Sequence, residues 1–417
     1  MIKYELVGFN NNVDLQTLKV PLYVYLELTH SCNFNCKFCS VNKKSSNFIS
    51  VSLAKKVLNE LKKNNIYDIY YTGGEPMLHP SFNEIIEYGN KLGFRQTVLT
   101  NGSLIKKNEI ILDKLMCVCV SLHGTKKVHN LLTRSDNYDS LIENIKLVKK
   151  YTNVKINYTV TSENQDISEM INVLDLASKY NIEVSFAKYN NVGNGKRNNC
   201  SIDINKFVET LDILKNKGYK FGINDCISPC LLEDRYEYLS HGCGAGYLFA
   251  SITYDGNVKI CPSSNEVLGN ISKSSFVNIW NQKYLKEYRQ FDWIPLYCKS
   301  CKNLAKCRCG CKVELQNKIT EFNDYNVETR KNETWNKIKD KKMRVNISIL
   351  RKENKDFINL SNPPRKYNAE AVQVIEKLNN GVIPEQIENA KDFILALYRD
   401  NLVKKVDDSV EKEIEGR

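Results

Sequence analysis

The chain has 417 residues, which is enough for one large hydrophobic core or for two to three smaller ones. Its formal net charge of +12 fits nucleic acid, an acidic membrane surface or an acidic peptide as partner, but the lysines are scattered along helix-like segments. No stretch approaches the roughly 18 uninterrupted apolar residues of a membrane span, and the first residues lack the order of an export signal. We therefore expect a cytoplasmic protein with no membrane partner and no dedicated face for nucleic acid.

In the first half of the chain, short β-branched or aromatic runs alternate with amphipathic stretches, which is typical of βα units around a parallel sheet. Ser52 is expected to cap one helix, and Pro80 and Ser81 to open another that Gly93 closes. Six strands with six helices predict an α/β fold, a partial (βα)6 barrel. The strands are expected at residues 23–29, 68–72, 96–100, 117–122, 155–160 and 183–188.

The composition divides the chain into four parts. Residues 1–19 are an N-terminal extension, and the α/β core follows over residues 20–215. In residues 216–334 the periodicity fades and cysteines concentrate, so we expect this loop-rich part to be held by metal more than by an apolar core. The last part covers residues 335–417, with strands expected at 344–350 and 356–360 and helices at 369–378 and 390–400.

Fifteen cysteines in a chain without an export signal call for an explanation other than disulfides. The cytosol keeps thiols reduced, and clustered cysteines of cytosolic proteins usually hold a metal or take part in catalysis. Cys117 and Cys119 alternate with Val on a predicted buried strand, which indicates core packing. The other cysteine clusters predict metal sites.

Cys32, Cys36 and Cys39 form a CX3CX2C motif directly after the first predicted strand. Three thiolates supply one ligand fewer than a four-cysteine iron-sulfur site needs, so one iron of a [4Fe-4S] cluster would stay open to another ligand. The alternatives are a zinc site completed by His30 and a chance grouping of cysteines. The segments that follow the next strands bear on this choice.

Glycine and polar residues come at the ends of the next three predicted strands. Gly73 and Gly74 allow backbone to approach a ligand closely, and the Glu75 carboxylate can accept a hydrogen bond from an ammonium group. An ordinary glycine-rich turn is the alternative. Because functional groups of parallel α/β folds collect at the carboxyl ends of the strands, these residues are expected around one site. The third and fourth strands end with Thr100, Asn101 and Ser121.

This ordered series of motifs resembles the radical SAM superfamily over roughly residues 20–215. The resemblance implies that the three cysteines hold a [4Fe-4S] cluster whose open iron binds S-adenosyl-L-methionine (SAM). It implies further that the Gly-Gly-Glu segment contacts the methionine amino group, and that Ser121 lies near the ribose or carboxylate. The residues implied to bind the cofactor are Phe38, Gly73, Gly74, Glu75, Thr100, Asn101 and Ser121.

Two further positions belong to the same resemblance, and a third departs from it. Asn164 and Gly193 fall at the ends of the fifth and sixth strands. The chain departs from the family at His123, where related enzymes often carry Asp. An imidazole can accept a proton near neutral pH, so His123 is a candidate catalytic proton acceptor, and a structural histidine is the alternative.

A second cysteine region resembles the SPASM extension of radical SAM enzymes that modify peptides and proteins. Cys243 and Cys261 enclose a C-X12-G-X4-C spacing, and Tyr254, Asp255 and Gly256 between them fit a tight hairpin. The SPASM extension holds auxiliary iron-sulfur clusters, whereas a zinc ribbon is the alternative for such spacings. The other motif, C-X2-C-X5-C-X3-C, consists of Cys298, Cys301, Cys307 and Cys311.

The SPASM resemblance implies one or two auxiliary [4Fe-4S] clusters. One would use Cys243, Cys261 and Cys311, with an upstream cysteine such as Cys230 as fourth ligand. The other would use the cysteines at 298, 301 and 307. The usual seventh cysteine after Cys311 is missing from this sequence. This second cluster would therefore take Cys309 or Cys226, keep an open iron, or be absent.

Residues 335–417 contain two short strand-like runs followed by two helices, which predicts a small winged-helix-like domain. This arrangement is similar to the PqqD-like elements that recognise precursor peptides. Such elements capture a leader peptide by adding it as a strand to an exposed sheet edge. A DNA-binding winged helix and a structural cap are the alternatives.

Together these resemblances imply a radical SAM enzyme that matures a ribosomally made precursor peptide under anaerobic conditions. Ferredoxin or flavodoxin would donate the electron with which the cluster cleaves SAM to methionine and a 5′-deoxyadenosyl radical, which removes a hydrogen from the peptide. The auxiliary clusters would accept the second electron as a thioether or carbon-carbon crosslink forms. The alternatives are an anaerobic sulfatase-maturating (formylglycine-generating) enzyme and a non-catalytic iron-sulfur or zinc regulator that binds DNA.

Overall fold

The chain forms two compact units, each with its own sheets and helices. One unit is built from residues 17–321, and the other from residues 1–16 together with residues 322–417. In the described part of the chain, no helix is long and apolar enough to cross a membrane. The computed structural model describes residues 4–6, 18–41, 46–190, 192–228, 234–240, 242–291, 304–314, 335–336, 338–345, 350–353, 356–359, 365–399 and 402–405.

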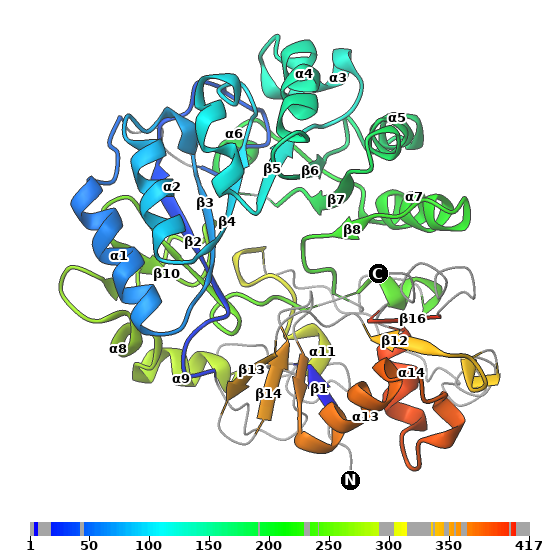
Figure 1. Cartoon of the computed structure of the whole chain (residues 1–417). Coiled ribbons are helices and arrows are strands. Elements are labelled where there is room, and N and C mark those ends of the chain that lie inside the picture. The colour runs from blue at the N-terminus through cyan, green and yellow to red at the C-terminus, as the bar shows by residue number, and fades with distance from the viewer. Residues whose placement is uncertain are drawn as a thin grey trace. The chain divides into compact units, whose positions relative to one another are not determined.

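Six parallel strands form the centre of the larger unit, and they lie side by side in chain order (Figure 1). Parallel neighbours need a crossover connection, and helical segments supply it here. The predicted α/β core is confirmed, and the strand bounds differ from the predicted ones by two residues at most. The strands are β2 (Tyr23–Thr29), β3 (Asp68–Gly73), β4 (Arg95–Thr100), β5 (Cys117–Ser121), β6 (Asn153–Val160) and β7 (Glu183–Lys188).

Strand register gives this sheet one apolar face and one polar face. Leu26 pairs with Tyr71, Tyr71 with Val98, and Val98 with Val118, and all four side chains are fully buried. The helices pack on this face with apolar stripes of their own (Figure 1). The alternate residues point to the other face, because side chains alternate along a strand. The polar face therefore lines the inside of the partial barrel.

Helix α1 begins two residues before the predicted position. Its N-cap is Ser50, whose side chain accepts a hydrogen bond from the Leu53 N–H, so the expected cap at Ser52 is wrong. Helix α2 follows Ser81 as expected, and Gly93 has a φ of +81° just after it. The helical segments of the core are α1 (Val51–Lys63), η1 (Pro76–Leu78), α2 (Phe82–Lys91), η2 (Lys106–Lys114), α3 (Lys126–Thr133), α4 (Tyr138–Val148), α5 (Ile167–Lys179), α6 (Gly193–Arg197) and α7 (Ile204–Asn216).

The cysteine-rich part extends the same sheet. β9 (Phe249–Ile252) pairs in parallel with β2, and β10 (Asn257–Lys259) pairs antiparallel with β9. Gly256, with a φ of +82°, closes the predicted hairpin between them. β11 (Gly269–Asn270) adds a last strand, and β8 (Gly222–Ile223) borders β7 at the opposite edge.

This part also has an apolar core, and the prediction that metal contributes more than this core stays a prediction. Ile252, Val258, Phe276 and Trp280 are each fully buried. The hairpin continues the barrel sheet, so its apolar side joins the core of the whole unit. The remaining helical segments are η4 (Asp234–Leu239), α8 (Phe276–Trp280), α9 (Lys283–Arg289), α11 (Leu304–Cys307) and η5 (Lys312–Glu314).

The smaller unit contains two antiparallel sheets, whose described strand orders are β1-β15-β14-β13 and β12-β16. The strand predicted at 344–350 is wrong: β12 ends at Val345 and β13 begins at Leu350, in a different sheet. The helices agree with the predicted ones within one residue. The elements are β1 (Tyr4–Leu6), β12 (Met343–Val345), β13 (Leu350–Glu353), β14 (Asp356–Asn359), β15 (Arg365–Tyr367), α13 (Ala369–Asn379), η6 (Pro384–Gln386), α14 (Lys391–Arg399) and β16 (Val403–Lys405).

Strand β1 is an element that the sequence analysis missed. Its register places Tyr4 opposite Tyr367 and Glu5 opposite Lys366, so the N-terminal residues belong to the same unit as the C-terminal ones. Three residues are too few to show a periodicity. Buried Val374, Leu378 and Ile394 of α13 and α14 form the core of this unit.

Candidate active site

Cys32, Cys36 and Cys39 lie in the loop that follows β2, at the carboxyl end of the parallel sheet. The Cys39 N–H donates to the Cys36 carbonyl at 3.3 Å, and the Phe34 N–H donates to the Cys32 Sγ at 3.4 Å. All three are partly exposed thiols outside any disulfide. The motif therefore forms a local turn at the carboxyl end of the sheet.

The backbone of the Gly-Gly-Glu segment holds the start of this loop. The Gly74 N–H donates to the Thr29 carbonyl and the Glu75 N–H to the Ser31 carbonyl, both at 2.8 Å. A Cβ on Gly73 would lie 2.1 Å from the Thr29 oxygen, and one on Gly74 would lie 2.0 Å from the Ser31 oxygen. Gly73 also has a φ of +118°. Both glycines are thus required by the close approach of β3 to the cysteine loop.

The Glu75 carboxylate is fully buried and joins β3 to β4. Oε1 accepts from the Met77 N–H at 3.0 Å and from the Thr100 hydroxyl at 2.8 Å, and Oε2 accepts from the Asn101 N–H at 2.8 Å. Burial raises the pKa of Glu75 to about 7, against the lowering effect of these bonds. A hydrogen bond from an ammonium group of SAM to Glu75 stays a prediction.

Asn101 connects β4 to the first cysteine. Its Nδ2 lies 2.9 Å from the Asn33 Oδ1 and 3.9 Å from the Cys32 Sγ. Its Oδ1 accepts from the backbone N–H and the hydroxyl of Ser103. The side chain is therefore held in place beside the Cys32 thiol, in agreement with the expected grouping of strand ends.

The loop after β7 closes on the third cysteine. A Cβ on Gly193, which has a φ of +57°, would lie 2.6 Å from the Cys39 carbonyl oxygen. The Gly195 N–H donates to the same carbonyl at 3.2 Å, and Asn198 Nδ2 donates to the Lys37 carbonyl at 2.7 Å. The segment after β7 thus adds to the contacts from the end of β3 that fix this loop.

His123 is buried beside Phe38, and their rings meet edge to face at 4.6 Å. Its Nδ1 accepts the Thr159 N–H at 3.0 Å, and the buried Asn164 amide donates to its carbonyl at 3.1 Å. Burial, aided by His129, lowers the pKa of His123 well below its ordinary value. The ring nitrogen that could take a proton is occupied, so this geometry favours a structural role and catalysis by His123 stays a prediction.

Ser121 ends β5 on the polar inner face, where it pairs in register with Asn157 of β6 and is partly exposed. Cys117 is buried as expected, and Cys119, which points to the same face as Cys117 and Ser121, is partly buried. Burial raises the pKa of Cys119 to about 12, which keeps its thiol protonated.

A second set of thiols converges beside the β9–β10 hairpin. The Cys226 thiol is within hydrogen-bonding reach of Cys243 and Cys311, which raises the pKa of Cys226 and lowers that of Cys243. Cys261 is close enough to both Cys243 and Cys311 that their charges help burial to raise its pKa to about 12. The structure therefore brings Cys226 to the place that the sequence assigned to a cysteine such as Cys230.

The structure describes only some of the other expected auxiliary ligands. Cys230, Cys298 and Cys301 lie outside the described residues. Cys307 ends α11 and is buried. Cys309 has a φ of +63°, between Arg308 and Gly310 at +50° and +70°. Consecutive left-handed residues are strained for non-glycine side chains, and they turn the chain sharply just before Cys311.

Three charged residues near the cysteines were missed by the sequence analysis. The buried Arg308 guanidinium donates to the Cys243 carbonyl at 3.0 Å, and burial lowers its pKa to about 10. Buried Glu27 and Lys259 form an ion pair between β2 and β10. Arg308 stands between two cysteines in the sequence, which is a usable signal, whereas Glu27 looked like an ordinary strand residue.

Both sets of thiols suit iron-sulfur clusters. The first offers three thiols in a cradle that leaves no room for a Cβ at Gly73, Gly74 or Gly193. The second offers four thiols next to a buried guanidinium, whose charge suits an anionic thiolate cluster. Within the described residues, no three His, Cys, Asp or Glu side chains lie close enough to hold a single metal ion.

Comparisons with known proteins agree with this geometry. Residues 26–177 match the model of the radical SAM superfamily, and residues 243–308 match that of SPASM, an iron-sulfur cluster-binding domain. Mycofactocin maturase MftC of Mycobacterium tuberculosis is 25% identical over 312 residues, which cover 70% of this chain and 79% of that protein. The antilisterial bacteriocin subtilosin biosynthesis protein AlbA of Bacillus subtilis is 27% identical over 302 residues, 68% of this chain and 64% of AlbA.

Two solved structures share the fold. Streptococcus suis SuiB bound to precursor peptide SuiA has a TM-score of 0.61 at 21% identity, covering 74% of this chain and 76% of SuiB. Histidine-tagged anSMEcpe with bound AdoMet has a TM-score of 0.55 at 21% identity, covering 73% of this chain and 93% of anSMEcpe. With these two matched domains, this chain is an enzyme of the radical SAM superfamily that uses a [4Fe-4S] cluster, SAM and the auxiliary iron-sulfur chemistry of a SPASM domain.

Proposed function

We propose that this enzyme is a maturase that installs a thioether or carbon-carbon crosslink in a ribosomally made precursor peptide. The observation that carries the proposal is a separate strand-and-helix unit attached to the unit that holds both sets of thiols. The names of MftC and AlbA and the SuiB–SuiA complex support a peptide substrate. Ferredoxin or flavodoxin is the proposed electron donor.

The inner face of the barrel suits a peptide backbone. The bound cofactor supplies a one-electron cleavage whose product removes a hydrogen atom, and the protein supplies position. Tyr25 and Tyr70 lie on this face, with ring centroids 5.3 Å apart. Burial raises the pKa of both phenols, that of Tyr70 to about 12, so both stay neutral. Neutral phenols, with Ser121 and Asn157, can donate hydrogen bonds to peptide carbonyls and exclude water.

The smaller unit is proposed to capture the leader of the precursor. In the described sheet β1-β15-β14-β13, β13 has a strand partner on one side only. An edge strand offers unpaired backbone groups, and a leader peptide can add to it as a further strand. This mode tolerates different leader sequences, which suits an enzyme that acts at a distant core segment.

Co-expression with the product of a short reading frame beside the gene tests this function. We expect a peptide that has lost two hydrogen atoms for each crosslink, with fragmentation that locates the joined residues. The control is the Cys32→Ala/Cys36→Ala/Cys39→Ala variant, which should return unmodified peptide. Unmodified peptide from the active enzyme would contradict the proposal.

The formylglycine-generating alternative uses the same two modules, and anSMEcpe shares their fold. The strand-and-helix unit speaks against it, because oxidation of one Cys or Ser needs no leader-binding sheet. A sulfatase-derived peptide incubated with the enzyme separates the two activities, since formylglycine forms an aldehyde that reacts with a hydrazide probe. The DNA-binding regulator is excluded, because the chain is an enzyme.

A further inference from the structure

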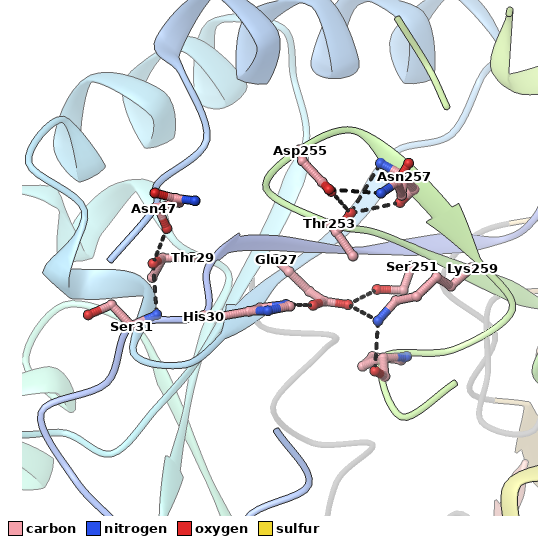
Figure 2. Close-up of polar contacts among 11 residues, drawn as sticks. Glu27, Thr29, His30, Ser31, Asn47, Ser251, Thr253, Asp255, Asn257 and Lys259 are labelled. Atoms are coloured by element: carbon pink, nitrogen blue, oxygen red, sulfur yellow. Dashed lines mark hydrogen bonds and ion pairs between the residues drawn. The ribbon is translucent and has the colours of Figure 1, made fainter. Parts of the chain in front are cut away.

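A buried polar cluster lies where the barrel sheet meets the cysteine hairpin. Figure 2 shows Glu27 of β2 facing Ser251 of β9 and Lys259 of β10. Tyr25 pairs with Ser251, and Ser251 with Lys259, so these side chains share one face with Glu27, two residues beyond Tyr25. That face is the polar inner face of the barrel. Glu27 is 3% exposed and Lys259 is 7% exposed.

Both oxygens of the Glu27 carboxylate are bonded. Oε2 accepts from His30 Nε2 at 2.6 Å. Oε1 accepts from the Ser251 hydroxyl at 2.6 Å and lies 3.1 Å from Lys259 Nζ, which also donates to the Pro262 carbonyl at 2.9 Å. Burial alone would raise the pKa of Glu27, but the bond from His30 and the charge of Lys259 lower it. Glu27 is therefore a buried, ionised carboxylate with three side-chain partners.

Two partners of Glu27 lie close in sequence to the two cysteine sites. His30 precedes Cys32 by two residues, and Lys259 precedes Cys261 by two residues. The His30 ring also meets the Tyr254 ring of the hairpin edge to face, at 4.9 Å between centroids. The Glu27 carboxylate on β2 thus contacts a residue just before Cys32 and a residue just before Cys261.

Burying a charged pair in this place does not favour stability by itself, because desolvation consumes most of the attraction. An apolar pair of the same size would serve simple packing. A buried pair with fixed hydrogen bonds instead specifies one arrangement, since any shift of the hairpin on β2 would leave a charge unpaired. The buried apolar face already specifies the register of β9 on β2, and the ion pair adds a penalty for any remaining shift of the hairpin.

We propose that Glu27 is a positioning residue that fixes the auxiliary cysteine hairpin against the SAM-cluster loop and balances the charge of Lys259 beside Cys261. This role of Glu27 goes beyond peptide maturation, because it concerns both cluster sites whatever the substrate is. Its test therefore needs no peptide, and its failure is distinguishable from failure of the proposed maturase activity.

The first test is the midpoint potential of the auxiliary cluster, measured by redox titration and electron paramagnetic resonance in the Cys32→Ala/Cys36→Ala/Cys39→Ala background. Glu27→Gln keeps the shape but leaves the Lys259 charge unbalanced, and a nearby positive charge favours the reduced cluster. We expect the potential to rise. Glu27→Asp keeps the charge and should return it toward the parent value.

Asp139→Asn is the matched control, since Asp139 of α4 pairs with Lys126 of α3 and both side chains are exposed. It should leave the potential unchanged. A Glu27→Gln protein with full iron content and the parent potential would overturn the proposal. If Glu27→Gln does not fold, Lys259→Gln replaces it, with a fall in potential expected and an unchanged potential counting against the proposal.

The second test uses the full set of cysteines and measures the affinity for SAM from the spectral change of the first cluster. Because Glu27 also holds His30, the Glu27→Gln variant should bind SAM more weakly than wild type. Ser251→Ala removes a bond on the hairpin side alone and should not change SAM affinity. Equal SAM affinity for Glu27→Gln and wild type would refute the joint control of both sites.

Discussion

The two cysteine sites of this enzyme are held in different ways. Backbone hydrogen bonds and glycines from the ends of β3 and β7 fasten the loop of Cys32 and Cys39. Two buried charged side chains lie near the auxiliary thiols: Arg308 donates to the Cys243 carbonyl, and Lys259 donates to the Pro262 carbonyl next to Cys261. A site built from backbone needs glycine at fixed places, whereas a site built from side chains depends on charges far apart in the sequence.

The largest effect is expected from Gly74→Ala at the backbone-held site. The new Cβ would lie 2.0 Å from the Ser31 carbonyl oxygen, so the strand end and the cysteine loop must separate. Displacement of about 1 Å at a catalytic group lowers rates by about 100-fold, and we expect at least that loss of 5′-deoxyadenosine formation. Gly218→Ala is the control for backbone strain without a clash, because its φ of +87° strains an alanine while nothing lies within 4 Å of its Cβ position. Near-normal activity of Gly74→Ala would show that the close approach is dispensable.

The auxiliary site is tested next with Cys226→Ala. Because the Cys226 thiol reaches Cys243 and Cys311, we predict that the variant loses the iron of one auxiliary cluster and keeps the SAM cluster. Iron and sulfide analysis with Mössbauer spectroscopy measures this. Cys200→Ala serves as control, since Cys200 belongs to neither set. Full iron content in Cys226→Ala would return the role of fourth ligand to Cys230.

Glu75 allows a pH test of the backbone-held site. Its folded-state pKa of about 7 lies above the ordinary 4.5, so its contribution to stability is fully present below pH 4.5 and is lost as pH rises through 7. At about 1.4 kcal/mol per pKa unit this amounts to about 3 kcal/mol. Urea unfolding of cluster-free protein at both pH values should show this loss for wild type. Glu75→Gln should not show it, whereas Glu84→Gln, on exposed Glu84, should keep it.

The smallest effect is expected at helix α1, which carries no cysteine. Ser50→Ala removes the bond to the Leu53 N–H and should destabilise the protein by about 1 kcal/mol. Ser52→Ala should have less effect, because Ser52 contacts only the Ser50 hydroxyl in the cap. Both variants should keep all iron. A loss of iron from Ser50→Ala would show that cluster retention follows general stability and not the local contacts.

The features that could be predicted from the sequence are local or periodic ones. The six strands and the place of the first cysteine loop followed from alternation and spacing, because each lies within a short segment. The hairpin at Gly256 was predicted for the same reason. The split between β12 and β13 was not, since a run of β-forming residues does not reveal that two sheets divide it.

The side-chain contacts between distant segments could not be predicted. Glu27 and Lys259 are far apart in the chain, and neither residue type signals an ion pair by itself. The SPASM resemblance implied Cys230 for this cluster and Cys226 for the other one, and the fold places Cys226 beside Cys243. Tertiary packing decides such pairs, so the auxiliary site was predicted in kind but not in its ligands or charges.

One measurement tests most directly whether the two sites have separate tasks. Anaerobically reconstituted protein is incubated with SAM and dithionite, and 5′-deoxyadenosine is scored by chromatography. Wild type and Cys226→Ala/Cys243→Ala should both form 5′-deoxyadenosine, whereas Cys32→Ala/Cys36→Ala/Cys39→Ala should form none. Formation by the triple variant at the wild-type level, with its iron content verified, would contradict the assignment of SAM cleavage to the Cys32 loop.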